Sequence, residues 1–219
     1  MPTKTTDLRY DVPLYTISEA AMHLGMNQGT LGRWAQRNEL VHSLDPQTSR
    51  GARLPFISMV EAQFYLLLRR DGLSLQSIST GMMAARKELG EDFLLRDRLA
   101  HDGTDILINL ADANAANAWE RARDRQGGLQ GVIERGLKPI YWGADNRPER
   151  LRLVAYEGVE VTVDPRYAFG QPILAESGVR TEDVIKLFKA GDSMRVVADE
   201  FDIRQEVVES IVRTHVLAA

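Results

Sequence analysis

Two short helices in immediate succession, predicted near the N-terminus, constrain the fold of this chain more than any other feature of its sequence. Thr16 and Glu19 have the spacing of a capping box, which is typical of the first turn of a helix. Gly25 is suited to end that helix, because glycine readily adopts the left-handed conformation found after a helix C-terminus. Asn27 can cap a second helix, which we expect over about 28–38. So short a connection is typical of a helix-turn-helix.

The side chains of this helix pair are also arranged as in a helix-turn-helix. Small residues are needed where the second helix crosses the first, and Ala20 and Ala21 meet this need. Met26 can fill the space beneath the turn. The apolar face of the second helix, at positions i, i+3 and i+4, consists of Leu31, Trp34 and Ala35. We therefore expect one face of the second helix to be buried and the opposite face to be exposed.

The exposed face of the second helix is polar and lacks acids. Its candidate DNA-binding residues are Asn27, Gln28, Thr30, Arg33, Gln36 and Arg37. Arginine suits guanine and glutamine suits adenine in the major groove. No Asp or Glu occurs between Ala20 and Asn38, although the whole chain has 27 Lys and Arg against 31 Asp and Glu. This pattern predicts a local DNA-binding surface on an acidic protein, and the alternative is an ordinary helical corner with a polar outer face.

A β-hairpin is expected after the helix pair. Two short apolar stretches, 40–41 and 54–57, enclose the turn-forming residues 45–51. No acid occurs between Thr48 and Ser58, which leaves the arginines of this hairpin without an acidic neighbour in the sequence.

Two further helices are predicted after the hairpin. Ser58 and Glu61 form another capping box, and the helix that they open should end near Arg70. Ser74 can cap the next helix, expected to end near Gly90.

Residues 15–90 resemble the winged helix-turn-helix of MerR-like regulators. The resemblance covers the helix pair, the hairpin and the two helices that follow. In that family the hairpin, or wing, contacts the DNA backbone, so the resemblance implies that Arg50 and Arg53 bind phosphates. Gly32 departs from the pattern, since such proteins usually carry a larger, often basic residue there.

The remainder of the chain is predicted to contain a small β-layer followed by three helices. The strands are expected over 139–142, 151–156 and 159–163, and the helices over 181–189, 193–201 and 204–216. The predicted fold is mainly α with a small β component, that is, α+β. Its predicted regions are a MerR-like winged helix-turn-helix with dimerisation helices over 1–90, a central α/β linking region over 91–158, and a C-terminal three-helix, helix-turn-helix-like domain over 159–219.

Residues 159–213 resemble a short bacterial domain of unknown function that occurs in many antitoxins. The resemblance rests on Val163-Asp164-Pro165, on residues 169–174 and on the helix boundary at Gly191-Asp192. The segment Glu176-Ser177-Gly178 departs from the Gly-Thr-Arg usual in that domain. From Glu176 onward there are six basic and nine acidic residues, which favours a packing or protein-docking module over a second DNA-binding unit.

Taken together, the two ends of the chain resemble the larger antitoxins of VapBC-type toxin–antitoxin modules. The resemblance implies an antitoxin that binds a PIN-domain ribonuclease toxin and represses its own operon by binding a double-stranded DNA operator. Because one short recognition helix reads only a few base pairs, we also expect a homodimer. The alternatives are a stand-alone MerR-like transcription regulator that senses a small ligand, and a pure protein-interaction module.

A basic segment in the middle of the chain offers candidate toxin contacts. These are Trp119, Arg121, Arg123 and Arg125. A guanidinium group can lie among carboxylates that otherwise hold Mg²⁺ in a nuclease, and Trp119 could be buried against the partner. The alternative is a solvated helix face, because Glu120 and Asp124 interrupt the arginines.

The sequence contains no motif that predicts catalysis. It has no cysteine, no glycine-rich phosphate loop and no protease or hydrolase signature, and its four histidines are scattered. We therefore expect no enzyme activity, no cofactor and no metal site. The N-terminus lacks an apolar signal segment, and the large apolar run at 64–68 is far shorter than the roughly 20 residues that span a bilayer, so we expect a cytoplasmic protein.

Overall fold

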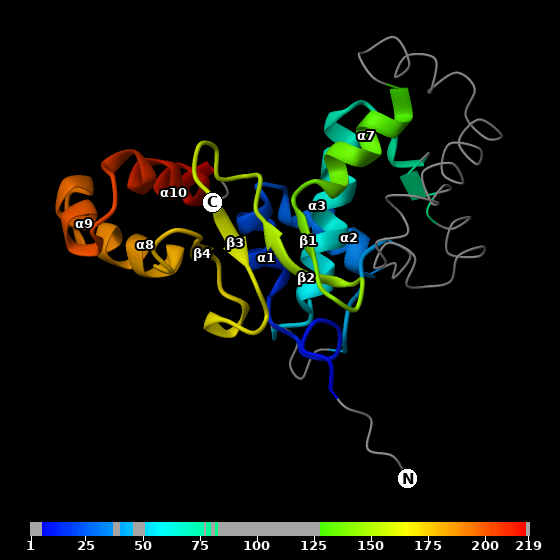
Figure 1. Ribbon diagram of the computed structural model, residues 1–219, viewed down its shortest axis with the longest axis horizontal. Coiled ribbons are helices and arrows are strands. Elements are labelled where there is room, and N and C mark those ends of the chain that lie inside the picture. Colours follow the sequence, from blue (N-terminus) through cyan, green and yellow to red (C-terminus); the bar gives the residue numbers. More distant parts are fainter. Residues whose placement is uncertain are drawn as a thin grey trace.

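The structure is a computed structural model of the chain, and it describes residues 6–36, 40–45, 51–76, 78, 79, 82 and 128–217. Over these residues the protein has an α+β fold, as predicted, in which helices surround a small antiparallel sheet (Figure 1). Three helices, α8, α9 and α10, lie at one end of the molecule, and α7 lies beside α3 at the other end.

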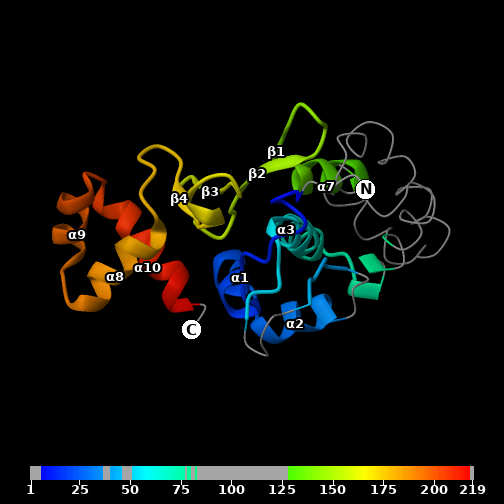
Figure 2. The same ribbon diagram turned by 90° about the horizontal axis from the view of Figure 1, so that it is seen from below.

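The N-terminal part of the fold is built around one long buried helix. Its helices are α1 (Ile17–Leu24), α2 (Gln28–Gln36) and α3 (Phe56–Arg70). Most side chains of α3 are buried, because α1 and α2 lie on one side of it and the sheet lies on the other (Figure 2). The described residues from Leu75 to Met82 are helical, and the rest of the helix expected over 74–90 lies outside the described residues.

The start of α3 corrects one prediction. The helix begins at Phe56, not near Ser58, and Pro55 is its N-cap residue. Proline tolerates this position because its missing N–H would have no helical partner there. Ser58 and Glu61 are buried and bind the backbone of His42 instead: the Ser58 hydroxyl donates to the His42 carbonyl (2.6 Å), and the His42 N–H donates to the Glu61 carboxylate (2.6 Å).

The prediction of a hairpin over 40–57 is only partly confirmed. Residues 56 and 57 belong to α3, so the second apolar stretch is not a strand. The Leu44 N–H donates to the Arg53 carbonyl (2.8 Å), but Leu54 pairs with Tyr15 in an antiparallel bridge rather than with the first apolar stretch. Residues 46–50, at the tip of the expected wing, lie outside the described residues.

A four-stranded antiparallel sheet follows α7 (Gly128–Leu137). Its strands pair in chain order and are β1 (Ile140–Trp142), β2 (Pro148–Arg152), β3 (Val161–Val163) and β4 (Ile173–Leu174). Leu151 lies opposite both Ile140 and Val163, which places its fully buried side chain in the middle of the sheet.

The second strand ends earlier than the sequence predicts. We expected a strand over 151–156, whereas β2 spans Pro148–Arg152 and Val154 lies in a turn. The cause is the buried amide of Gln63 in α3, which donates to the Arg152 carbonyl (2.8 Å) and accepts from the Val154 N–H (3.1 Å). The Arg152 carbonyl and the Val154 N–H are therefore bonded to this amide and are not available to extend the strand pairing of β2.

The three C-terminal helices occur where the sequence predicts them. They are α8 (Thr181–Ala190), α9 (Met194–Phe201) and α10 (Gln205–Leu217). Gly191 ends α8 in the left-handed conformation (φ 107°), and the Ser193 hydroxyl caps α9 by accepting from the Val196 N–H (3.3 Å). A short 3-10 turn, η3 (Ala168–Gly170), precedes β4.

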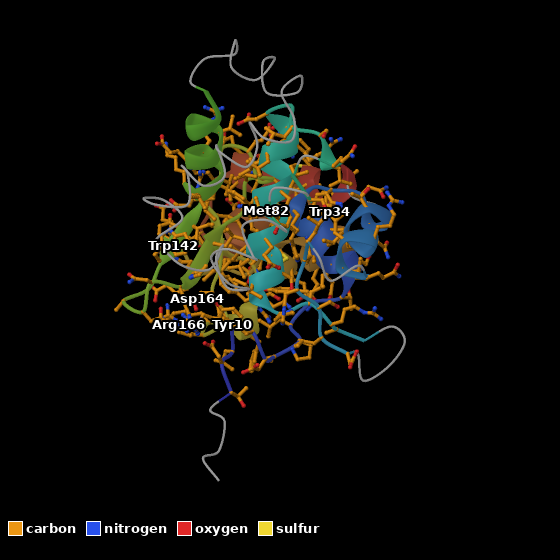
Figure 3. The ribbon with its side chains drawn as sticks, turned by 90° about the vertical axis from the view of Figure 1, so that its right-hand side faces the viewer. Tyr10, Trp34, Met82, Trp142, Asp164 and Arg166 are labelled. Carbon is orange, nitrogen blue, oxygen red and sulfur yellow. The ribbon has the colours of Figure 1, made fainter. Side chains whose placement is uncertain are left out.

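The three predicted regions share one continuous hydrophobic core. The sheet combines β1 and β2 with β3 and β4, and α10 packs against α1. Two ion pairs lie beyond the ends of the strands. Arg9 binds Asp145 (2.6 Å), between β1 and β2, and Arg166 binds Asp164 (2.6 Å), directly after β3. Figure 3 labels Asp164 and Arg166. The domain boundaries at 90/91 and 158/159 remain predictions.

Candidate DNA-binding surface

The turn between α1 and α2 is built as the sequence predicts. The Glu19 N–H donates to the Thr16 hydroxyl (3.2 Å) and the Thr16 N–H donates to the Glu19 carboxylate (2.8 Å), which completes the capping box. Gly25 ends α1 with φ 62°. A Cβ atom at Gly25 would lie 3.0 Å from the Cβ of Ala155, so both the backbone conformation and the close approach of the Ala155 loop require glycine here.

Helix α2 is anchored by its predicted apolar face. Leu31, Trp34 and Ala35 are buried, and the Trp34 ring packs edge-on against the ring of Tyr65 in α3 with 6.2 Å between centroids. The Asn27 side chain caps the helix by accepting from the Thr30 N–H (3.1 Å). The orientation of α2 is therefore fixed by packing on one side and by a cap at its start.

The opposite face of α2 is exposed and polar. Gln28, Arg33 and Gln36 are exposed, Thr30 is half-buried, and Arg33 donates to the Thr30 hydroxyl (3.2 Å). Within the described part of the chain, no carboxylate forms an ion pair with Arg33. A Cβ atom at Gly32 would only touch Ile17 at 3.9 Å, which shows that packing does not require a glycine at this position.

The other candidate residues fall into two groups. Arg53 is half-buried, its N–H donates to the Tyr15 carbonyl (3.0 Å), and its guanidinium has no ion-pair partner among the described residues. The remaining candidates lie outside the described residues, so their roles stay predictions: Arg37, Arg50, Trp119, Arg121, Arg123 and Arg125.

A cleft beside the turn is a feature that the sequence does not reveal. Its volume is about 640 Å³, and it lies between the start of α2, the end of α3, the loop after β2 and α10. Arg70 and Arg213 line it. These two arginines are far apart in the sequence and lie outside the predicted helix pair at 16–38, so only the packing of α10 brings them together.

A pair of histidines, His23 buried and His215 half-buried, joins α1 to α10. His23 is only 4% exposed, and its Nδ1 lies 2.8 Å from the Tyr156 hydroxyl. The His215 ring packs edge-on against it with 5.7 Å between centroids. Burial, with a smaller contribution from His215, lowers the pKa of His23 to about 3, and burial also lowers the pKa of His215. Both rings are therefore neutral at pH 7 and serve as packing groups.

The described residues hold no group of three His, Asp or Glu side chains arranged to bind a metal ion. Among the helices of the described ranges, none is both long enough and apolar enough to cross a membrane.

Two protein-family models match the chain, one at each end. The model described as "Putative DNA-binding HTH domain" matches residues 13–82, which include α1, α2 and α3. The model described as "Protein of unknown function (DUF433)" matches residues 161–213, which extend from β3 into α10. The fold and these matches define a DNA-binding helix-turn-helix protein whose C-terminal part is helical.

Comparison with whole proteins extends this classification to nearly the full chain. A curated protein of Mycobacterium tuberculosis, "Putative antitoxin VapB45", is 30% identical over 218 residues, covering 90% of this chain and 91% of the relative. The crystal structure of Rv2018 from the same organism superposes with a TM-score of 0.73 at 30% identity, covering 94% of this chain and 99% of that one. The chain belongs to this family of VapB-type antitoxins, whose N-terminal part is a helix-turn-helix.

Proposed function

We propose that this antitoxin binds the operator of its own operon through α2 and neutralises a PIN-domain ribonuclease. The observation that carries the DNA half of this proposal is the exposed polar face of α2, where Gln28, Arg33 and Gln36 have no acidic neighbour on the helix itself. This face contrasts with the net charge of −4 of the whole chain, and its side chains suit base edges in the major groove.

The N-terminal half of a recognition helix is the part that reaches bases. Gln28 and Thr30 lie in that half, and Arg33 lies near the middle of α2 and donates to the Thr30 hydroxyl (3.2 Å), so these three side chains read sequence in this proposal. Gln36 is the last residue of α2, and Arg37 follows it in the sequence. Arg50 and Arg53 bind phosphates, which orients α2 without reading bases. A homodimer places two such helices on two half-sites about one turn of DNA apart.

The toxin half of the proposal rests on membership of the VapB family. A PIN-domain ribonuclease has an acidic, metal-binding cleft, and a guanidinium forms strong charge-assisted hydrogen bonds with carboxylates. Arg121, Arg123 and Arg125 are the proposed groups for that cleft, and Trp119 is the proposed apolar contact beside them.

Replacement of Arg33 with alanine is expected to weaken binding to the operator by about 1–3 kcal/mol and to relax base preference at one position, because a bidentate contact to guanine is lost. Fluorescence anisotropy with a duplex from immediately upstream of the reading frame measures the loss. Arg195→Ala, which removes an exposed arginine of α9, is the matched control and should bind normally. Unchanged affinity in Arg33→Ala, with native circular dichroism, would exclude α2 as the reading helix.

The same variant separates the two halves of the proposal in cells. Arg33→Ala should derepress a reporter placed behind the operator but still protect cells that co-express the toxin from the adjacent gene, since α2 does not contact toxin in this scheme. Loss of protection at a normal protein level would show that α2 also serves toxin binding. Protection by a variant in which Arg121, Arg123 and Arg125 are all alanine would contradict the assigned toxin contacts.

A further inference from the structure

The cleft beside the turn of the helix-turn-helix joins the DNA-reading unit to the C-terminal helices. One wall is the turn and the start of α2, including Asn27 and Gln28, and the opposite wall is α10. The hydroxyl of Ser210 donates to the Glu157 carbonyl (2.9 Å), and the hydroxyl of Thr214 is shared between the carbonyls of Ser210 (3.0 Å) and Ala155 (3.3 Å). These hydrogen bonds hold α10 against the loop after β2, so the width of the cleft is set by the fold.

Two exposed arginines from different helices line this cleft. Arg70 is the last residue of α3, and Arg213 lies on α10 between the two hydroxyl residues that fix the helix. In the described ranges neither guanidinium has an ion-pair partner, in contrast to Arg135 and Arg180, which bind Asp71 (2.9 Å) and Asp183 (2.7 Å). Glu157 also lines the cleft, but it forms no ion pair with either arginine.

The position of this basic pair relative to α2 points to the DNA backbone. Gln28, at the start of α2, belongs both to the face proposed to read bases and to the lining of the cleft. In Figure 2, α2 and the C-terminal end of α10 lie along the same edge of the molecule. When a recognition helix enters the major groove, the phosphates that border the groove pass beside its N-terminal end.

We infer that Arg70 and Arg213 bind phosphates of the DNA backbone that flanks the site read by α2, so that the last helix of the C-terminal module is part of the DNA interface. This inference rests on the proposed DNA-binding function of α2. The segment from Glu176 onward has six basic and nine acidic residues, which disfavours DNA reading by a second helix-turn-helix. Its contribution is one arginine, which the packing of α10 against α1 carries to the cleft.

The test measures affinity and its salt dependence for Arg70→Ala, Arg213→Ala and the double variant of the full chain. The probes are a duplex from immediately upstream of the reading frame and a random duplex of equal length. Each single variant is expected to bind both duplexes about three- to tenfold more weakly, with the log–log salt slope shallower by about 0.9 for each lost contact. Hydroxyl-radical footprinting should show lost protection on the backbone flanking the site, with the bases read by α2 unchanged.

Arg204→Ala is the matched control. Arg204 is exposed, has no ion-pair partner in the described part of the chain, and precedes Arg213 by about 13 Å along the helix. This variant loses the same charge from the same module, so normal affinity is expected. An equal loss of affinity in Arg204→Ala would show that net charge, rather than the cleft, sets the effect, and would overturn the inference.

Three further results would also overturn it, and they differ in what they leave standing. In the first, the double variant has normal affinity and a normal salt slope, while Arg33→Ala binds the operator more weakly. This would reject the role of the cleft in DNA binding but keep the proposed function of α2. In the second, the wild-type protein binds neither duplex, which would reject both the role of the cleft and the proposed DNA-binding function. If inorganic phosphate at matched ionic strength raises the melting temperature of the wild type but not of the double variant, and both bind DNA equally, the cleft takes a free phosphate and not DNA.

Discussion

Replacement of Trp34 with alanine is expected to destabilise the protein by about 3–5 kcal/mol, the usual cost of removing a large aromatic side chain from a core. Trp34 is 4% exposed and packs against the ring of Tyr65. Helix α2 is a nine-residue helix, far too short to be stable by itself, and only three of its residues are buried. The variant should therefore lose specific DNA binding together with stability. Urea unfolding followed by far-UV circular dichroism measures the change.

Trp142 provides the matched control for this experiment. It lies in β1, is half-buried, and is on the opposite side of α3 from Trp34 (Figure 3). Trp142→Ala removes the same type of side chain but less buried area. It should therefore lower the free energy of unfolding clearly less than Trp34→Ala and leave DNA binding intact. A loss in Trp34→Ala no larger than in Trp142→Ala would mean that α2 is held by other contacts.

The parts of the fold that the sequence predicts well are those set by neighbouring residues. The start of α1 follows from Thr16 and Glu19, its end from Gly25, and the start of α9 from Ser193. Each signal acts within four residues of the chain, through a backbone conformation or a single hydrogen bond. The apolar spacing of Leu31 with Trp34 predicts in the same local way which face of α2 is buried.

The parts that it predicts poorly are set by residues distant in sequence. The early end of β2 depends on the amide of Gln63, and no pattern within residues 148–156 reveals this partner. The apolar run at 54–57 was expected to be a strand, but Pro55 divides it into a bridge to Tyr15 and the first turn of α3. The apolar character of such a run can be read from the sequence, but the segment with which it pairs cannot.

The candidate site shows the same division. The reading face of α2 could be predicted, because all its residues lie within one short segment with a recognisable period. The cleft could not, because Arg70 and Arg213 come from helices whose relative position depends on the whole core. The net charge of the C-terminal module argues against DNA binding. It gives no information about where a single side chain such as Arg213 lies, so the position of Arg213 in the cleft could not be predicted from it.

Acidification is expected to destabilise the protein through the buried histidine of α1. The folded state lowers the pKa of His23 from 6.5 to about 3, chiefly by burial against Tyr156 and His215. The unfolded chain takes up a proton near pH 6.5 that the folded protein does not accept. The stabilisation is thus complete above pH 6.5 and is lost as the pH falls towards 3. At about 1.4 kcal/mol per pH unit, this amounts to about 2 kcal/mol at pH 5 and about 3 kcal/mol at pH 4.

His23→Asn tests this origin, because an amide can keep the hydrogen bond to Tyr156 yet does not titrate. Urea unfolding at pH 7, 6 and 5 should show a fall in stability for the wild type that is about 2 kcal/mol smaller in the variant. Asp7 and Asp145 have their pKa values lowered by hydrogen bonds from Arg9, so their protonation weakens the fold only at a pH below this range. His215→Asn should reduce the same pH dependence, because burial shifts the pKa of His215 in the same direction. Parallel curves for the wild type and His23→Asn would show that His23 is not the group responsible for the loss of stability on acidification.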